Sequence, residues 1–439
     1  MKTKNHTTKL LFLLLTMVPS VNLMANEIKA IDLADTLSAS QLVSAVLAAN
    51  PRLELAQATW QASVARIEQQ SAFDDPQFQY GFAPLTIDKQ KSNTRASEFG
   101  QRFEVSQKLP FPGKLHLRAK TAEFQAEARQ QDIAGLQLLL ASSAKSLFAD
   151  WYFIHQAIAI DKLKHSLLKE FRDITETQYS TGRATKQDVL RAETELALLK
   201  HQSIVLQRQR KTRLAQLNTL LNRPIDKPLA IPQQLVEIKQ LPDLEQLQTQ
   251  AMHSRPELKA IAANINAHKS KAGLAELAYY PDLKLSAGYN SLWDNEDKRF
   301  NIGIGFNIPL DQGKRRAAEQ EAKANSQQAN WQKIDLQARI KEQLLIAYAQ
   351  TEESLHVLRL YRQQLSPLAD ENISAAMADY QSGKTDLLAV IKSKKQRLQT
   401  QLKTEQALAD VHRRLAELEQ AVGTIEPLST TDQTGSIEQ

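Results

Sequence analysis

The chain has 439 residues, of which 24% are charged, 42% hydrophobic and 6% aromatic, and its formal net charge at pH 7 is +6. This mild excess of positive charge does not indicate nucleic-acid binding. The mean hydropathy of −0.41 and the lack of an apolar run of ~20 residues beyond the N-terminus exclude transmembrane helices in the mature protein. Cysteine is absent, so disulfides cannot stabilise the chain, and lipidation of an N-terminal cysteine is not expected.

The N-terminus, residues 1–25, is predicted to be a secretory signal peptide. Three lysines precede an apolar core at residues 10–18, and small residues follow it, so cleavage is expected after Ala25 or after Ser20. An N-terminal membrane anchor is the alternative, but this core is too short to span a bilayer as a helix. We therefore expect an exported protein.

The remaining chain carries four landmarks that occur twice in the same order. Pro51 recurs 205 residues later as Pro256, and the turn at Gly182 recurs 201 residues later at Gly383. This spacing exceeds the roughly 20–50 residues of a solenoid unit, so we expect an internally duplicated chain. The predicted organisation is the signal peptide (1–25), a first repeat (38–228), a linker (229–242), a second repeat (243–423) and a disordered tail rich in Ser, Thr and Gln (424–439).

Each repeat is expected to begin with a helix that is followed by two strands. The helices are predicted at about 38–73 and about 244–277, with breaks or restarts at Pro51 and Pro256. After each helix the apolar period changes to two, which is typical of strands with one apolar and one polar face. The predicted strands lie at about 76–84, 98–109, 282–293 and 299–309, and polar loops join them in pairs as hairpins.

Each repeat is expected to continue with a long helical hairpin, at about 114–222 in the first repeat and about 314–422 in the second. The outgoing helix of the first hairpin lacks proline for about 65 residues, or ~100 Å at 1.5 Å per residue. In the second hairpin, Pro367 predicts a bend. The turns at 179–185 and 380–385 each carry a glycine suited to a tight reversal.

The four predicted strands match membrane β-strands in length and alternation, with the apolar face toward lipid and the polar face toward water. Four strands cannot close a channel, and open edges are not tolerated in lipid. We therefore expect a cyclic homotrimer with 12 strands (4 × 3). The expected fold class is mainly α with membrane β, in which the long helical hairpins extend into the periplasm and pack side by side. The alternative is a periplasmic adaptor or a coiled-coil scaffold, in which the strands form a small cap.

The sequence carries no recognisable catalytic or metal-binding constellation. The nine histidines include no His-x-x-x-His pair, cysteine is absent, and methionine occurs only five times. This composition leaves no soft-metal site. We therefore expect no enzymatic activity and no cofactor, and passive conduction as the function.

Residues 38–423 resemble the TolC-like outer-membrane efflux factor family. The resemblance rests on the paired starts Asn50-Pro51 and Arg255-Pro256, on the strand-to-helix segments 107–114 and 308–314, and on the two glycine turns. It implies a trimeric channel-tunnel, with a 12-stranded barrel in the lipid of the outer membrane and an α-helical barrel across the periplasm. It also implies two partners, a periplasmic adaptor and an inner-membrane pump that supplies the energy.

The segment Leu109-Pro110-Phe111-Pro112-Gly113-Lys114 is most similar to the subgroup that serves heavy-metal pumps of the resistance-nodulation-division (RND) type. That similarity implies heavy-metal cations as the cargo, either copper and silver or cobalt, zinc and cadmium. A drug-efflux duct and a type I secretion duct are the alternatives with the same fold.

The two hairpin turns are where the resemblance implies the periplasmic entrance, the gate and the adaptor contact. The residues expected there are Tyr179, Gly182, Arg183, Asp188, Tyr380, Gly383, Lys384, Asp386 and Lys392. Some family members carry aspartates six and nine residues after the glycine of the second turn, where this chain has Ala389 and Lys392. We therefore expect Asp386, Lys384 or Arg183 to form the gate in a different way.

Overall fold

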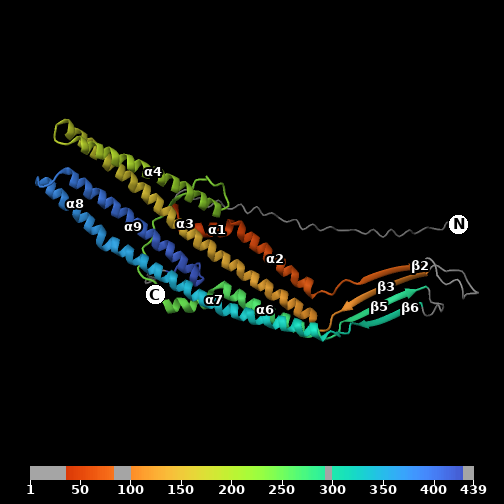
Figure 1. Ribbon diagram of the computed structural model, residues 1–439. Helices are drawn as coiled ribbons and strands as arrows, with labels where there is room; N and C mark the ends of the chain where they lie inside the picture. The colour runs from red at the N-terminus through yellow and green to blue at the C-terminus, as the bar shows by residue number, and fades with distance from the viewer. Residues whose placement is uncertain (1–35, 84–99, 292–298, 429–439) are drawn as a thin grey trace, which may run out of the picture.

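A sheet lies at one end of the elongated molecule, and two helical hairpins extend away from it (Figure 1). The computed structural model describes residues 36–83, 100–291 and 299–428. The predicted signal peptide, the two loops of the strand hairpins (84–99 and 292–298) and most of the predicted tail lie outside the described residues.

The sheet has four antiparallel strands in the order β2-β3-β5-β6. Its strands are β2 (Gln77–Ala83), β3 (Gly100–Leu109), β5 (Leu283–Asn290) and β6 (Phe300–Phe306). All four lie within the predicted ranges. Because β3 pairs with β5, the sheet joins two parts of the chain that are far apart in sequence.

The second pair of strands is shorter than the alternation of apolar residues predicted. β6 stops at Phe306 although the alternation continues to Ile308. The side-chain oxygen of Asn307 accepts a hydrogen bond from the backbone N–H of Asp282 at 2.5 Å, and Pro309 has no N–H to donate to a ladder. β5 ends at 290, and the rest of its predicted range runs into residues that the structure does not describe.

The register puts apolar residues on one face of the sheet and polar residues on the other. One row across the strands is Tyr80, Phe103, Tyr289 and Phe300, and the next row is Gln79, Glu104, Gly288 and Asn301. Because successive residues of a strand point to opposite faces, these two rows lie on opposite sides of the sheet. On the apolar face, rings of neighbouring strands pack together, as for Tyr80 and Phe103 with centroids 4.9 Å apart.

The helices occur in the same order before and after residue 230. The first set is α1 (Ala39–Ala49), α2 (Pro51–Ser71), α3 (Lys114–Ser180) and α4 (Lys186–Leu220). The second set is α5 (Leu244–Ser254), α6 (Pro256–Leu277), α7 (Gln312–Leu360), α8 (Ser366–Gln381) and α9 (Leu387–Val422). A π-helical turn, η2 (Tyr361–Leu365), separates α7 from α8. It interrupts the hydrogen-bond ladder directly before Pro367, where the sequence predicts a bend.

Each predicted helix break is tied to the end of another helix. Asn50, which precedes Pro51, donates from Nδ2 to the carbonyl of Leu220 at the end of α4, at 3.0 Å. Arg255, which precedes Pro256, donates from Nη1 to two carbonyls in the last turn of α9, at 3.1 Å each. The last carbonyls of a helix have no partner within it, so these side chains hold the ends of α4 and α9 in place.

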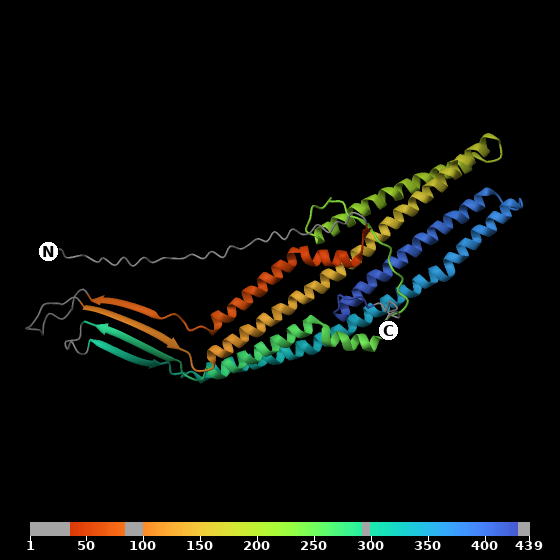
Figure 2. The same cartoon turned by 180° about the vertical axis from the view of Figure 1, so that it is seen from behind.

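The helices form a layer of parallel columns (Figures 1 and 2). α3 contacts α2 and α4 as well as α6 and α9, and α7 contacts α6 and α9. α2 lies beside the half of α3 nearest the sheet, and α4 lies beside the half nearest the hairpin turns (Figure 2). α7 and α8 form the edge of the layer opposite to α2 and α4.

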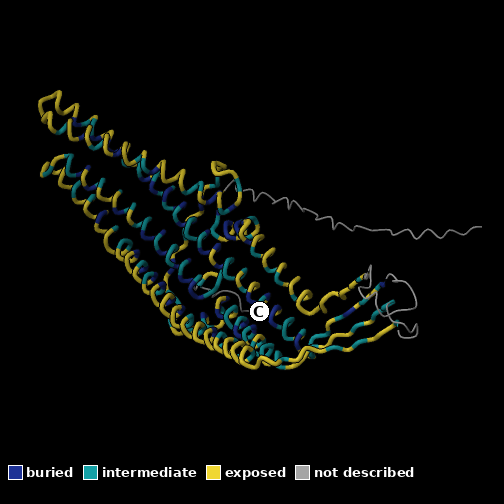
Figure 3. The backbone as a smooth tube through the Cα atoms, turned by 45° about the vertical axis from the view of Figure 1, so that its right-hand side comes forward, coloured by how far each residue is buried: buried dark blue, intermediate teal, exposed yellow. Residues whose placement is uncertain are grey.

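The apolar core lies between this layer and the segments that cover one of its faces. Leu42 of α1 packs with Trp151 of α3 in one cluster. In a second cluster, Ile238 and α5 pack against α7 and α9. Figure 3 shows the buried positions in the middle of the layer and exposed positions along the hairpin turns and the α7 edge.

Two segments that were predicted to be a linker and a disordered tail pack against other parts of the chain. Within the predicted linker 229–242, β4 (Ile231–Pro232) pairs in parallel with β1 (Thr36–Leu37). Residues 424–428 of the predicted tail are described, and the carbonyl of Ile425 accepts a hydrogen bond from Lys145 Nζ at 2.6 Å. Composition alone does not reveal such contacts, because the partners are far away in sequence.

Candidate functional site

The apolar face of the sheet is exposed over all four strands. Its exposed side chains are Phe78, Tyr80, Phe82, Phe103, Val105, Leu283, Leu285, Phe300, Ile302, Ile304 and Phe306. Ile302 has 89% of its surface exposed and Phe300 has 77%. An apolar surface that is several strands wide marks contact with lipid or with a partner.

The opposite face of the sheet is polar and carries charges. The Arg102 guanidinium contacts the Glu104 carboxylate at 2.7 Å, and Lys284 Nζ lies 4.0 Å from the same carboxylate. Gly288 has no room for a side chain on this face, because a Cβ there would lie 2.9 Å from the backbone carbonyl oxygen of Phe103. This face is therefore suited to contact with water.

Both lateral edges of the molecule are open within the described residues. β2 and β6 each pair with one neighbouring strand, so both expose backbone N–H and C=O groups on their outer side. The helical edges carry exposed apolar side chains, namely Leu55, Val64, Leu190, Leu198 and Ile204 on α2 and α4, and Trp331, Ile334, Leu345, Ile346, Leu360 and Leu368 on α7 and α8. Such edges are suited to contact between copies of the chain.

The first strand-to-helix joint is built on a buried lysine. Lys114, with 9% of its side chain exposed, places Nζ 2.7 Å from Asp282 Oδ1 and donates to the carbonyl of Tyr280 at 2.9 Å. The backbone N–H of Phe111 donates to the same carboxylate oxygen at 2.9 Å. Gly113 has a φ of +92°, which residues with a side chain rarely adopt. These contacts fix the direction of α3 relative to β5.

The second joint, which corresponds to the first in sequence, has a different geometry. Gly313 lies in the first turn of α7 and does not have a positive φ. Lys314 is exposed, and its backbone N–H donates to Asp311 Oδ1 at 2.9 Å. The pairing of Lys114 with Asp282 was not predicted, because it joins residues that are 168 positions apart.

The two hairpin turns lie at the same end of the molecule and have matching backbones (Figure 1). Gly182 has a φ of +73° and Gly383 a φ of +75°. In each turn the glycine N–H donates to the carbonyl of the tyrosine three residues earlier, at 3.0 Å. These tyrosines, Tyr179 and Tyr380, are partly exposed, at 47% and 41%.

The two carboxylates predicted to lie at the turns cap helices. Asp188 accepts hydrogen bonds from the backbone N–H of Thr185 at 3.1 Å and from its hydroxyl at 2.7 Å, at the start of α4. These bonds hold the pKa of Asp188 below its ordinary value. Asp386 accepts a hydrogen bond from the N–H of Ala389 at 3.0 Å, at the start of α9. Both carboxylates therefore stabilise helix N-termini.

The three basic residues predicted at the turns, Arg183, Lys384 and Lys392, are exposed. Among the described residues, none of them lies within ion-pair distance of a carboxylate. The structure therefore brings the predicted residues to one end of the molecule but does not join them in ion pairs with one another.

Polar contacts link the two hairpins to each other. Lys395 of α9 pairs with Glu195 of α4 at 2.6 Å, and Tyr152 of α3 donates to the carboxylate of Glu405 of α9 at 2.7 Å. A small apolar cluster around Ile391 lies between the hairpins near the turns. The interface between the hairpins is thus partly polar.

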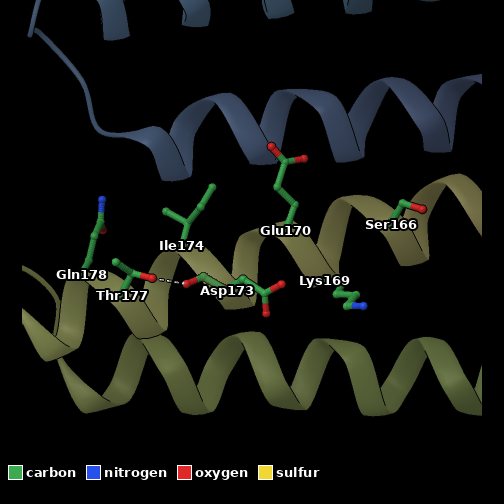
Figure 4. A pocket seen from close by; sticks show the side chains of 7 residues that line it. All are labelled: Ser166, Lys169, Glu170, Asp173, Ile174, Thr177 and Gln178. Atoms are coloured by element: carbon green, nitrogen blue, oxygen red, sulfur yellow. Dashed lines mark hydrogen bonds between the residues drawn. The ribbon is translucent and has the colours of Figure 1, made fainter.

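A groove lies along α3 close to the first turn (Figure 4). Its lining residues are Ser166, Lys169, Glu170, Asp173, Ile174, Thr177 and Gln178. In the close-up, Glu170, Ile174 and Gln178 point toward the blue ribbon of the second hairpin. The groove therefore presents charged and apolar groups of the first hairpin directly beside the second hairpin. A partner that docks there would contact both hairpins.

The described ranges contain no cluster of three or more His, Cys, Asp or Glu side chains that could hold a metal ion. In the same part of the chain, no helix combines the length and apolar character needed to cross a membrane. Nε2 of His155 is buried without a hydrogen-bond partner there, and its ring packs beside Trp151 with centroids 4.5 Å apart.

Comparison with known proteins yields a consistent set of similarities. A family model described as outer membrane efflux protein matches residues 42–223 and 247–424. The pyoverdine export outer membrane protein OpmQ of Pseudomonas aeruginosa is 24% identical over 397 residues, which cover 88% of this chain and 79% of that protein. The outer-membrane channel OprN superposes with a TM-score of 0.73 at 20% identity, over 88% of this chain and 89% of that chain. CusC, a protein studied for transmembrane channel formation, superposes with a TM-score of 0.73 at 18% identity, over 88% and 92% of the two chains.

Proposed function

The chain belongs to the outer membrane efflux protein family, and we propose that three copies of it join edge to edge into one tube. β2 of one copy would pair with β6 of the next, which closes a barrel of 12 strands (4 × 3) in the outer membrane. The helical columns would close below it into a barrel that crosses the periplasm. The observation that carries this proposal is an exposed apolar sheet face bounded by two open strand edges.

The edges supply the physical reason for closure. An unpaired strand edge in lipid leaves backbone groups without hydrogen bonds, and each such group costs several kcal/mol. A cyclic arrangement removes both edges at once. On the helical part, Trp331 of α7 is 70% exposed and Leu198 of α4 is 63% exposed, and the same closure would cover these side chains.

We propose that the assembled tube conducts its cargo passively and makes or breaks no bond. An inner-membrane pump would supply the energy, and a periplasmic adaptor would contact the hairpin turns and the groove beside them. Opening would move the second hairpin outward, which requires the contact between Lys395 and Glu195 to break. The exposed residues Arg183, Lys384 and Lys392 would then surround the entrance.

The proposal of heavy-metal cargo rests on the similarity of segment 109–114 to one subgroup. In the structure this segment contains the buried joint around Lys114, so its sequence has a structural explanation that is independent of cargo. OpmQ is named for the export of pyoverdine, which supports a duct for organic molecules as the alternative. A drug-efflux or type I secretion duct is compatible with the same fold.

Two neighbouring residues of β2 test the proposed barrel. Phe78 lies on the apolar face and Gln79 on the polar face. Phe78→Lys should strongly reduce the heat-modifiable trimer in outer-membrane extracts, because a lysine facing the middle of the bilayer costs about 2–4 kcal/mol per copy. Gln79→Lys, the matched control, should leave the trimer intact. Equal amounts of trimer for both variants would contradict the proposed orientation of the sheet.

A further inference from the structure

We propose that this tube selects for anions, so that its cargo is a negatively charged molecule and not a metal cation. The inference rests on the proposed function, since it requires the polar faces to line a common lumen. Its basis is a pattern of charge pairing. On the faces that would line the lumen, three carboxylates are each contacted by two cationic side chains, so that positive charge remains in each of the three groups.

The first of these groups lies on the polar face of the sheet. Glu104 contacts Arg102 at 2.7 Å and lies 4.0 Å from Lys284. The strand register places all three side chains on the same face. One carboxylate can balance one of the two cations, so a positive charge remains.

The second group lies where the same face meets the helices. Asp282 contacts Lys114 at 2.7 Å and Lys108 at 3.4 Å. Lys114 is buried, whereas Lys108 has 52% of its side chain exposed. The remaining positive charge is therefore on the cation that faces solvent.

The third group lies in a groove between α3, α4 and α9. Asp150 contacts Arg213 at 3.2 Å and Arg413 at 3.1 Å, and Arg208 lines the same groove. Arg413 also contacts Asp410 on its own helix. Three guanidinium groups thus face two carboxylates, and the groove remains positive.

This groove opens on the face of the helical layer that the core segments leave uncovered. Trp151 of α3 points to the covered face, where Nε1 donates to the carbonyl of Ala230 at 3.1 Å. Phe153 lines the groove and lies two residues further on, about 200° around a helix of 3.6 residues per turn. The covered face must lie outside the tube, because the covering segments would otherwise block the lumen. The groove therefore faces the lumen.

The hairpin turns carry charge of the same sign. Among the described residues, Arg183, Lys384 and Lys392 have no carboxylate within ion-pair distance, and these three cations outnumber the two carboxylates that cap helices there, Asp188 and Asp386. Closure of three copies would triple each excess. A lumen lined by charges of one sign concentrates ions of the opposite sign and repels ions of the same sign.

The test is the reversal potential of the purified full-length protein in planar bilayers, measured across a gradient of potassium chloride. The wild type should pass chloride in preference to potassium. Lys284→Gln keeps the contact between Arg102 and Glu104, so it should fold normally. It should lower the chloride-to-potassium permeability ratio by about fourfold, because one unit charge ~10 Å away across water changes the concentrations of chloride and potassium each by about twofold in opposite directions. Lys392→Gln should lower the ratio in the same direction. Lys239→Gln, an equal change of charge on an exposed residue of the covering segment, should leave it unchanged.

A wild-type preference for potassium would overturn the inference, since carboxylates would then outnumber cations along the lumen. A chloride preference that is identical in Lys284→Gln, Lys392→Gln and Lys239→Gln would overturn it as well. A protein that forms no pore in any form would instead overturn the proposed function, and the inference with it.

Discussion

The two strand-to-helix joints have similar sequences and different structures, whereas the two hairpin turns have similar sequences and similar structures. At the first joint Lys114 is buried against Asp282, and at the second joint Lys314 is exposed. At the turns, the glycines have φ values of +73° and +75°. The difference shows that a repeated motif fixes backbone geometry when its contacts are local, and does not fix it when the contacts come from elsewhere in the chain.

The largest expected effect comes from removing the buried lysine of the first joint. Lys114→Met should lower the free energy of unfolding by about 3 kcal/mol, because it leaves the carboxylate of Asp282 partly buried with only the Phe111 N–H and the longer contact to Lys108. Lys314→Met, the matched change at the second joint, should stay within about 0.5 kcal/mol of the wild type. Denaturant unfolding of the purified assembly, followed by circular dichroism, measures both. Equal destabilisation would show that the two joints are equivalent after all.

Alanine substitutions at the joint glycines should have effects of opposite sign. Gly113→Ala forces a side chain into a φ of +92° and places Cβ 3.2 Å from Leu277 Cδ1, so a loss of about 1–2 kcal/mol is expected. Gly313→Ala removes a glycine from the first turn of α7 and should stabilise the protein by up to about 1 kcal/mol. The same unfolding measurement applies, and a change of the same sign in both variants would contradict the comparison.

The parts of the fold that depend on local periodicity were predictable from the sequence. The outgoing helix of the first hairpin was expected from 114 to 179 and is observed as Lys114–Ser180. The apolar and polar faces of the strands followed from residue alternation. The positions of both turns followed from their glycines. The structure puts both turns, and with them the residues expected at the entrance, at the same end of the molecule.

The parts that depend on contacts between distant segments were not predictable. Alternation identifies the faces of a strand but not its partner, so the pairing of β3 with β5 was not foreseen. The same reason applies to the β1–β4 pair, to the contact of Lys114 with Asp282 and to the packing of 424–428. The pairing of charges on the proposed luminal faces was not predictable from the sequence either. Each carboxylate and its cations lie on different helices or strands, or two residues apart on one strand.

The smallest expected effect concerns the hairpin turns. Their backbones match, but the helix after the first turn is capped by Thr185 together with Asp188, and the helix after the second turn by Asp386. Thr185→Ala removes the hydroxyl that donates to Asp188, so the pKa of Asp188 should rise toward its ordinary value of 3.8. In the wild type the pKa of Asp188 is lower in the folded state than in the unfolded state. The contact therefore stabilises the fold fully at a pH above the unfolded-state pKa, and this stabilisation disappears as the pH falls through the folded-state pKa. Carboxyl resonances recorded by NMR as a function of pH measure the shift. Thr181→Ala is the control, because the Thr181 hydroxyl lies in the same turn but donates to the backbone carbonyls of Thr177 and Gln178. This variant should leave the pKa of Asp188 unchanged. An equal shift in both variants would exclude the Thr185 hydroxyl as the cause of the lowered pKa.

Disulfide cross-linking between the two open strand edges tests the central claim most directly. The chain has no cysteine, so a cysteine at Gln79 of β2, combined in turn with one at Asn301 or Gly305 of β6, can react only with the other introduced cysteines. If β2 pairs with β6 of the next copy, oxidation of outer membranes should give a reducible ladder on denaturing gels that ends at three chains. A chain that stays single for every cysteine pair, or a ladder that continues beyond three, would contradict the account.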